Sequence, residues 1–518
     1  MSKEGMVATS HPLAVQAGID ILKRGGNAVD AAIATAAVLT VVEPASTGIG
    51  GDVFALVYIS EKGELKAINA SGYAPEKATI EEYKKRGYNS VPEDGILSVT
   101  VPGALKGWTR LLELFGNLSL KDVLSPAIRY AKNGFPVTEI ISKEWQIAEE
   151  KLRRYKVDKY LINGRAPRPG EIFRQPDLAR TLEKIALEGE EIFYQGEIAR
   201  RIVENSEKQG GFLSLEDLAN YEPIWVSPVS TSYRGYTVFE LPPNTQGVVV
   251  LQALNIVEGY DLRTIPQSSP EYYHILIEAI KFAFADAESY ICDPEFCQIP
   301  LDKLLSKKYA KECRKLIGER ARRSTFSAGK FFGDTVYLAT ADSAGNMVSF
   351  INSLFHPFGS GILVEGTGII LQNRGHLFSL DPGHPNCLQP RKRPFHTLIP
   401  GMVFLKDKPF MSFGVMGGFM QPQGHLQILC GIIDYGLNPQ EALNIPRFRF
   451  YEGKKISLES GVDSITKETL SKKGHLLISA GQFELGEFGG GQIIILDPDT
   501  GVFLGGSDPR KDGCVQGY

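Results

Sequence analysis

The sequence predicts an α+β protein with a mostly helical first part and a β-rich last part. From Pro102 to about Tyr290, apolar residues recur at the three- and four-residue spacing of helices. After Gly333 the pattern changes to short runs of β-branched and aromatic residues, which favour strands. With 518 residues, 43% of them apolar, the chain can bury a large core, although its length leaves open one intertwined domain or several.

Two helices are expected near the start of the chain. Residues 12–24 have helical apolar spacing behind Pro12, and Gly25 and Gly26 end the segment. Asn27 then caps a second helix, Ala28–Val42. Because this second segment is apolar on nearly every side, we expect it to be buried between other elements.

A glycine turn, Ser46–Asp52, leads into the expected strand Val53–Tyr58. The turn lacks the full spacing of a dinucleotide-binding loop and the lysine of a P-loop. It also runs from a helix to a strand, whereas phosphate-binding loops run from a strand to a helix. The sequence therefore does not favour a nucleotide site here.

The remaining elements follow the same two patterns. Residues 324–334 contain turn formers and are predicted to be a loop. Two strands, Thr335–Ala341 and Met347–Ile351, should pair as a hairpin through the turn Asp342–Asn346. The other expected helices are Leu105–Phe115, Leu120–Lys132, Pro176–Leu187, Tyr272–Tyr290 and Gly424–Tyr435, and the other expected strands include Gly368–Leu371 and Ile493–Leu496.

The composition argues against several partners and locations. Lys and Arg total 56 against 60 Asp and Glu, so a net charge of -4 gives no positive field for nucleic acid or an anionic membrane. The first residues lack the apolar core of an export signal, and the longest apolar stretch, Ala31–Val42, is shorter than the roughly 20 residues of a membrane helix. These features predict a cytoplasmic protein without a nucleic-acid or membrane partner.

Cysteine and histidine patterns give no signal for a metal or cofactor. The six cysteines form no CxxC pair, and no two of the eight histidines have metal-ligand spacing on a helix. We therefore expect reduced structural thiols, no metal and no cofactor.

Thr335 is the candidate nucleophile. A threonine that begins a strand after a Gly-Asp turn is ordinarily a turn residue with β propensity. However, the sequence has no GxSxG elbow, no HExxH motif and no Cys/His signature that would indicate another kind of hydrolase site. A cut before Thr335 would create an α-amine with a pKa of about 7.7 to 8, which could accept the proton of the hydroxyl.

Two glycine clusters downstream could supply backbone donors for an oxyanion. They are Gly414–Gly418 and Gly489–Gly491. Glycine lets backbone N–H groups approach a substrate closely, and such donors stabilise the charge that develops during acyl transfer. For the second cluster, a plain turn is an equally good interpretation.

The chain resembles the γ-glutamyltranspeptidase family over nearly its whole length. The matching segments are Arg24–Ala32, Glu43–Gly51, Val101–Gly103, Gly333–Thr335, Gly359–Gly361, Lys392–Pro394, Gly417–Gly418 and Ser507–Arg510. The resemblance implies the four-layer αββα fold of N-terminal nucleophile hydrolases. It also implies self-cleavage between Asp334 and Thr335, which would leave a large chain, 1–334, and a small chain, 335–518, as one intertwined heterodimer.

The resemblance assigns roles to further residues. Ser353 matches a family threonine that hydrogen-bonds the nucleophile, and Gly417 and Gly418 match the oxyanion donors. The residues with which the family binds the head group of glutamate are replaced. Their positions correspond to Ser71, Phe355, Arg374, Leu377 and the pair His396–Thr397.

These replacements change the expected substrate. A desolvated ammonium group needs an acceptor or an anion, and neither Leu377 nor Arg374 supplies one. The guanidinium of Arg374 suits a carboxylate, so we expect a small amide that bears a carboxylate and no amine. A structural salt bridge is the alternative role for Arg374. The short stretch Gly375–Arg391 also lacks the length of a family lid, which predicts a more open site.

Further motifs resemble the branch of the family that contains oxamate amidohydrolase and acylases. They are Asn373–Gly375, Leu380–Pro385 and Met420–His425. The leading hypothesis is therefore a self-processing amidohydrolase with an acyl-enzyme on Thr335. A γ-glutamyl hydrolase or transpeptidase acting on glutathione-like donors is the second hypothesis, and an unprocessed, inactive binding or scaffold protein is the third. The sequence leaves open a homo-oligomer.

Overall fold

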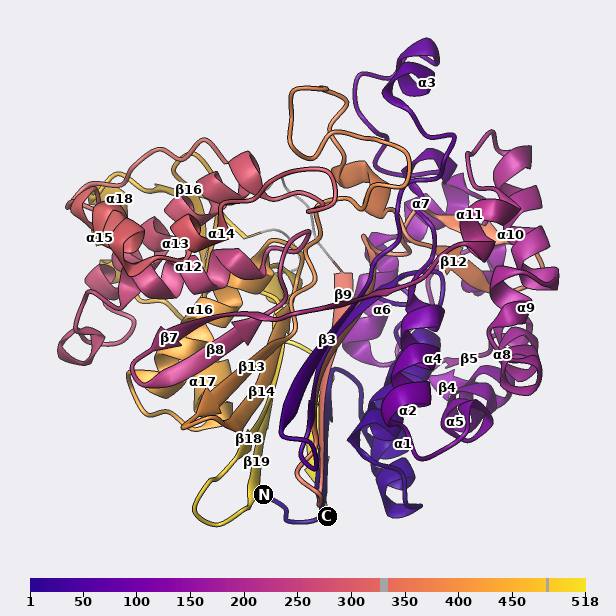
Figure 1. Ribbon diagram of the computed structural model, residues 1–518, viewed down its shortest axis with the longest axis horizontal. Helices are drawn as coiled ribbons and strands as arrows, with labels where there is room; N and C mark the ends of the chain where they lie inside the picture. Colours follow the sequence, from indigo (N-terminus) through magenta and orange to yellow (C-terminus); the bar gives the residue numbers. More distant parts are fainter. Residues whose placement is uncertain (327–333, 481–483) are drawn as a thin grey trace.

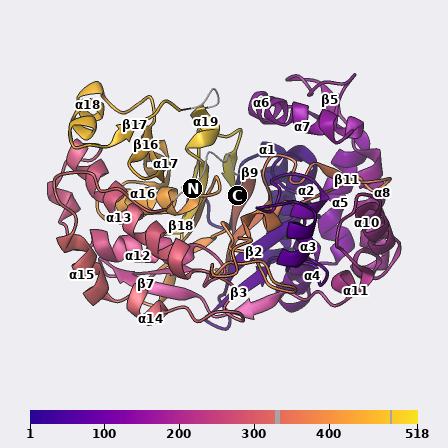
Figure 2. The same cartoon turned by 90° about the horizontal axis from the view of Figure 1, so that it is seen from above.

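Two β-sheets lie face to face at the centre of the molecule, and helices cover both outer faces (Figure 1; Figure 2). This arrangement is seen in a computed structural model that describes residues 1–326, 334–480 and 484–518. It confirms the expected αββα fold. The loop predicted for 324–334 falls largely on residues 327–333, which lie outside the described residues.

The first sheet combines strands from both ends of the chain. Met347–Asn352 of β10 pair with β9 on one side and with β2 on the other, both antiparallel. β1 pairs with β9 and with the last strand, β20, so the two termini lie close together (Figure 1). In order across the sheet, the strands are β20 (Cys514–Gly517), β1 (Gly5–Thr9), β9 (Asp334–Asp342), β10 (Met347–Phe355), β2 (Asp52–Ile59), β3 (Glu64–Ala70) and β6 (Ile224–Val226).

The second sheet also combines early and late strands. In order, they are β19 (Phe503–Ser507), β18 (Gly490–Leu496), β14 (Lys408–Met416), β13 (Gly401–Leu405), β8 (Tyr236–Glu240) and β7 (Val229–Tyr233). Both sheets therefore draw strands from each side of the bond between Asp334 and Thr335. A cut at that bond would leave two chains joined by shared β-ladders.

An apolar layer fills the space between the sheets. Its members include Phe54, Ile351, Met402 and Ile494, which are all fully buried. The buried phenol of Tyr337 crosses this layer, with its hydroxyl 2.8 Å from Ser349 Oγ. The alternation of strand side chains explains the layer, because every second residue of each strand faces the other sheet.

The first helical layer covers the outer face of the first sheet. Helix α2 contacts β9 and β10, and all 15 of its residues are buried, as its apolar sequence predicted. Helix α1 approaches α2 so closely that a Cβ on Gly18 would clash with Thr35. The main helices of this layer are α1 (Pro12–Lys23), α2 (Ala28–Val42), α4 (Ala104–Phe115), α5 (Leu120–Asn133) and α8 (Pro176–Glu188).

The second helical layer covers the other sheet. Helix α16 contacts β14, and α12 contacts β7 and β8. The main helices are α12 (Gly247–Val257), α13 (Pro270–Tyr290), α15 (Lys307–Lys315) and α16 (Met420–Ile433).

Shorter elements connect and flank the layers. They are α3 (Ile80–Lys85), α6 (Glu139–Ile147), α7 (Glu149–Arg154), α9 (Glu191–Tyr194), α10 (Glu197–Lys208), α11 (Leu215–Ala219), α14 (Leu301–Leu304), α17 (Pro439–Asn444), α18 (Ser464–Lys472), α19 (Glu484–Glu487), β4 (Phe135–Pro136), β5 (Ile172–Phe173), β11 (Ile362–Val364), β12 (Ile369–Leu371), β15 (Phe448–Glu452), β16 (Lys455–Leu458), β17 (Leu476–Leu477) and the 3-10 turns η1 (Ile96–Ser98), η2 (Asp158–Tyr160), η3 (Leu262–Thr264) and η4 (Arg374–Leu377).

Two expectations about the chain need correction. The region from Pro102 to Tyr290 is less uniformly helical than predicted, because β6, β7 and β8 run through it. The six cysteines are not all thiols, since the structure pairs Cys292 with Cys297 in a disulfide. Among the helices of the described residues, none combines the length and apolar character needed to span a bilayer.

A buried histidine pair ties α13 to the segment after α18. The Nε2–H group of His274 donates to the carbonyl of Gly318 at 2.8 Å, so its Nδ1 accepts from His475 Nε2, also at 2.8 Å. Burial lowers the pKa of His475 to about 2, and both rings are neutral at pH 7.

Glu278 lies beside this pair, and the three side chains have the residue types of a metal site. However, Glu278 already accepts a hydrogen bond from Lys281 at 2.8 Å. Lys281, Lys454 and Lys473 also place positive charge near His475, which lowers its pKa further and opposes a divalent cation. The cluster is therefore better explained as a structural network.

Replacing His475 by Gln should give a stability difference that depends on pH. In wild type, unfolding exposes an imidazole with a pKa of about 6.5, so the unfolded state binds more protons below that pH. Wild type should lose up to about 1.4 kcal/mol relative to His475→Gln for each pH unit below 6.5. Thermal denaturation of both proteins at pH 8, 7, 6 and 5 measures this. A difference that does not change with pH would contradict the neutral assignment.

Candidate active site

Thr335 is the second residue of β9 and is 1% exposed. Its hydroxyl oxygen lies 3.1 Å from Ser353 Oγ on the neighbouring strand β10. The pairing of β9 with β10 shifts register between Asn352 and Phe355, and this irregularity lies beside Thr335. The contact predicted between Thr335 and Ser353 is therefore present. The side chain of Asp334 lies outside the described part of the chain.

Phe355 fixes the geometry around Ser353. Its φ of 82° is in the left-handed region, which is uncommon for residues other than glycine. In this conformation its backbone N–H donates to Ser353 Oγ at 2.8 Å. One hydroxyl thus contacts both the candidate nucleophile and the backbone of the irregular turn.

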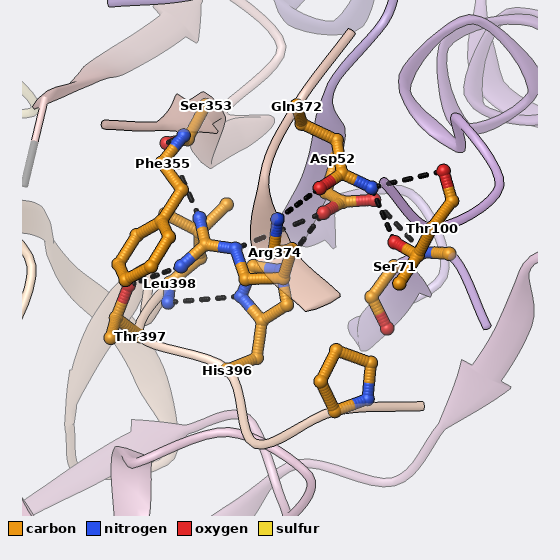
Figure 3. Close-up of polar contacts among 12 residues, drawn as sticks. Asp52, Ser71, Thr100, Ser353, Phe355, Gln372, Arg374, His396, Thr397 and Leu398 are labelled. Carbon is orange, nitrogen blue, oxygen red and sulfur yellow. Dashed lines mark hydrogen bonds and ion pairs between the residues drawn. The ribbon is translucent and has the colours of Figure 1, made fainter. Parts of the chain in front are cut away.

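Arg374, in η4, joins the predicted recognition residues (Figure 3). Its Nη1 donates to Thr397 Oγ1 at 2.7 Å, and its Nη2 donates to Ser353 Oγ at 3.3 Å. The guanidinium carbon lies 4.1 Å from the centre of the Phe355 ring, a cation–π distance. Arg374 is completely buried, so the open site expected from the short lid region is not seen.

Asp52 belongs to this cluster, although the sequence did not single it out. It follows the glycine turn directly and lies opposite Ser353 in the pairing of β2 with β10. A Cβ on Gly51 would clash with the carbonyl of Ser353, so glycine is what lets the turn approach β10 this closely. The position directly after the glycine turn was the one available signal.

The carboxylate of Asp52 has three polar neighbours. Oδ1 accepts the Gly72 N–H at 2.8 Å, whereas Oδ2 lies 3.2 Å from His396 Nε2 and 3.9 Å from Arg374 Nε. The salt bridge considered for Arg374 is therefore present. Because His396 Nδ1 accepts from the Leu398 N–H at 3.3 Å, its Nε2 carries the hydrogen and donates to Asp52.

Burial controls the charges of this cluster. Burial raises the pKa of Asp52 to about 7, although the positive charge of Arg374 opposes the rise. Burial lowers the pKa of Arg374 to about 9, and Asp52 opposes that change. His396 has a pKa well below its ordinary value, first because it is buried and second because Arg374 is close. The imidazole is therefore neutral at pH 7.

The predicted oxyanion glycines form the turn between β14 and α16. Gly417 and Gly418 have φ values of 123° and 61°, which residues other than glycine rarely adopt. Gln246 connects this turn to the Arg374 cluster, because its Nε2 donates to Thr397 O at 2.7 Å and to Gly418 O at 3.0 Å. The sequence did not single out Gln246, because its two partners lie more than 150 residues further along the chain.

The second glycine cluster has a packing role. Gly490 and Gly491 belong to β18, and the Gly491 N–H donates to Asp508 Oδ2 at 2.7 Å. Asp508 also pairs with Arg447 at 2.6 Å. A Cβ on Gly417 would lie 3.2 Å from Gly489 Cα, so the cluster makes room for the first glycine turn.

Two predicted recognition residues have other surroundings. Ser71 is buried and donates to Asn69 Oδ1 at 2.7 Å, and within the described part of the chain it makes no hydrogen bond with Arg374. Leu377 ends η4 and packs at the edge of the second helical layer. The structure thus brings together Thr335, Ser353, Phe355, Arg374, His396 and Thr397, with Asp52 as an addition.

A solved structure shares this fold over the whole chain. The crystal structure of a cephalosporin acylase from Bacillus halodurans matches with a TM-score of 0.95 and 49% identity, over 100% of this chain and 96% of that chain. The shared four-layer fold places the chain among enzymes of the N-terminal nucleophile amide hydrolase class.

Sequence comparisons identify the family. A model of the γ-glutamyltranspeptidase family matches residues 14–518. A glutathione hydrolase-like YwrD proenzyme of Bacillus subtilis is 42% identical over 99% of this chain and 98% of that protein. An oxamate amidohydrolase proenzyme of Klebsiella pneumoniae is 35% identical over 100% of this chain and 99% of its own length. The chain belongs to the γ-glutamyltranspeptidase family.

Replacing Gly417 by Ala should destabilise the protein by about 2 to 3 kcal/mol, because a positive φ strains alanine and its Cβ would crowd Gly489 and Met420. Gly436→Ala is the matched control. Gly436 also has a positive φ, 67°, but no atom lies close to the place that an added Cβ would occupy. The control should lose about 1 kcal/mol. Equal losses for the two variants in thermal denaturation would show that crowding at Gly417 is unimportant.

Proposed function

We propose that this protein is a self-processing amidohydrolase that uses Thr335 as its nucleophile and hydrolyses a small amide bearing a carboxylate. The observation that carries the proposal is a single hydroxyl, Ser353 Oγ, which contacts both Thr335 Oγ1 and the guanidinium of Arg374. A candidate nucleophile and a candidate carboxylate-binding cation are thus held side by side.

The first step would be cleavage of the chain itself. The Thr335 hydroxyl would attack the carbonyl carbon of Asp334, and the peptide nitrogen would leave as the α-amine of Thr335. Water would then hydrolyse the resulting ester to release the carboxylate of Asp334. The names of the relatives as proenzymes support this step. Residues 1–334 and 335–518 would remain together through the mixed sheets.

Turnover would use the new amine as the base. It would accept the proton of the Thr335 hydroxyl, and the oxygen would attack the amide carbonyl of the substrate. Protonation and departure of the amine would leave an acyl-enzyme, which water hydrolyses. The backbone N–H groups of Gly417 and Gly418 would stabilise the oxyanion, and a hydrogen bond with Ser353 would orient the nucleophile.

Arg374 supports the choice of substrate. Its guanidinium is one hydroxyl group away from Thr335, so a carboxylate bound there belongs to a short acyl group. In this single chain Arg374 is completely buried, and we propose that the site becomes accessible once the chain is cut. A γ-glutamyl substrate, which the names of relatives called glutathione hydrolases favour, would bring an ammonium group to a cluster that contains this cation.

Thr335→Ala should abolish both self-cleavage and turnover, because it removes the attacking oxygen. On a denaturing gel, wild type should give fragments of about 37 and 20 kDa from roughly 110 Da per residue, whereas the variant stays at full length. Thr335→Ser keeps a hydroxyl and should restore cleavage. A full-length wild-type chain after prolonged incubation would favour the unprocessed scaffold hypothesis instead.

Substrate preference separates the two enzymatic hypotheses. We expect wild type to hydrolyse oxamate or a glutaryl amide at least about tenfold faster, as kcat/KM, than γ-glutamyl-p-nitroanilide, because the latter must desolvate an ammonium group near Arg374. Parallel assays of the three amides measure this. Efficient hydrolysis of the γ-glutamyl compound would show that the head-group argument is wrong.

A further inference from the structure

Arg374 already has an internal anion. Asp52 is fully buried, and its Oδ2 lies 3.9 Å from Arg374 Nε (Figure 3). Backbone pairing fixes the position of Asp52 opposite Ser353, and the Gly72 N–H holds its other oxygen. The carboxylate therefore cannot move far from the guanidinium without breaking these contacts.

One guanidinium cannot fully neutralise two carboxylates in a buried site. If a substrate carboxylate binds Arg374 while Asp52 is ionised, this guanidinium faces two negative charges, and the second cation near Asp52, Arg393, acts on Asp52 more weakly than Arg374 does. The uncompensated buried charge weakens binding of the substrate. His396 does not relieve it, because the imidazole is neutral and uses its one N–H to donate to Asp52.

We infer that Asp52 sets the affinity of this site for a carboxylate by competing with it for the charge of Arg374. The site then binds an anionic acyl group best when Asp52 carries a proton. This inference rests on the proposed function, and it makes Asp52 a specificity-determining residue that touches Arg374 and not the reacting atoms.

Among Asp52 and the side chains that face it, only Asp52 changes its charge near neutral pH. Arg374 and Arg393 are cations, and both oppose the rise in the pKa of Asp52. His396 is neutral, as described above. Burial raises the pKa values of Tyr194 and Tyr221 well above the ordinary value of a tyrosine, so these two phenols also stay neutral. The pKa of Asp52 is about 7, so its charge changes around neutral pH.

Asp52→Asn should bind an anionic substrate more tightly. With glutaryl-p-nitroanilide at pH 8, where most of Asp52 is ionised, we expect KM to fall about tenfold, since removal of one charge a few ångströms away has at least this effect. With pentanoyl-p-nitroanilide, which has the same chain length but no carboxylate, KM should change less than about twofold. A residue with a purely structural role would raise KM for both compounds.

His396→Gln is the matched control. It perturbs the hydrogen bond that Asp52 accepts from the imidazole but leaves the charge of Asp52 in place. It should not lower KM for the glutaryl compound. If both variants lower KM equally, loosening of the site and not loss of charge is the cause, and the inference is overturned.

The pH dependence of KM provides a second test. Between pH 6 and 8, KM for the glutaryl compound should rise more steeply in wild type than in Asp52→Asn, because both Asp52 and the new α-amine of Thr335 lose a proton in wild type and only the amine does so in the variant. KM for the pentanoyl compound should stay level in both. Equal slopes for the glutaryl compound in the two proteins would refute the role of Asp52. Cleavage on the gel and turnover of the glutaryl compound by wild type report separately on the proposed function, so the two ideas can fail independently.

Discussion

The buried guanidinium of Arg374 is the interaction on which the rest of the candidate site depends. Taking a cation out of water costs several kcal/mol even after the protein relaxes, so the surroundings must supply partners. Asp52 supplies the opposite charge, Thr397 and Ser353 accept hydrogen bonds, and Phe355 offers the face of its ring. The contact with Ser353 also fixes the hydroxyl that lies beside Thr335.

Close backbone approach makes this cluster possible. Gly51 lets the turn before β2 lie against the backbone of β10, and Gly72 leaves room for the carbonyl of Val101. Asp52 is thereby held between β10 and the segment that carries His396. The glycine turn, whose sequence does not favour a nucleotide site, thus lets the backbone pack closely. This close packing brings the carboxylate of Asp52 beside the buried guanidinium of Arg374.

The layers of the fold were predictable from periodicity and resemblance, because long apolar helices such as α2 and the hairpin of β9 and β10 have strong local patterns. The short strands β7 and β8 were missed because they lack a clear alternation of their own, and because β8 is fixed by pairing with β13 and β7 by pairing with β8. In the site, the contact of Thr335 with Ser353 followed from the family. Asp52, Gln246 and the pair His274–His475 did not, since their partners are distant in sequence.

Phe355, one of the positions that the resemblance assigned to substrate recognition, illustrates why residue type alone could mislead. Its side chain cannot hydrogen-bond a substrate, yet its backbone N–H donates to Ser353 in a conformation that costs of order 1 to 3 kcal/mol. The stacking of the ring beneath Arg374 offsets part of that cost. The position therefore influences the hydroxyl beside Thr335 through its backbone, while its side chain stabilises a buried cation.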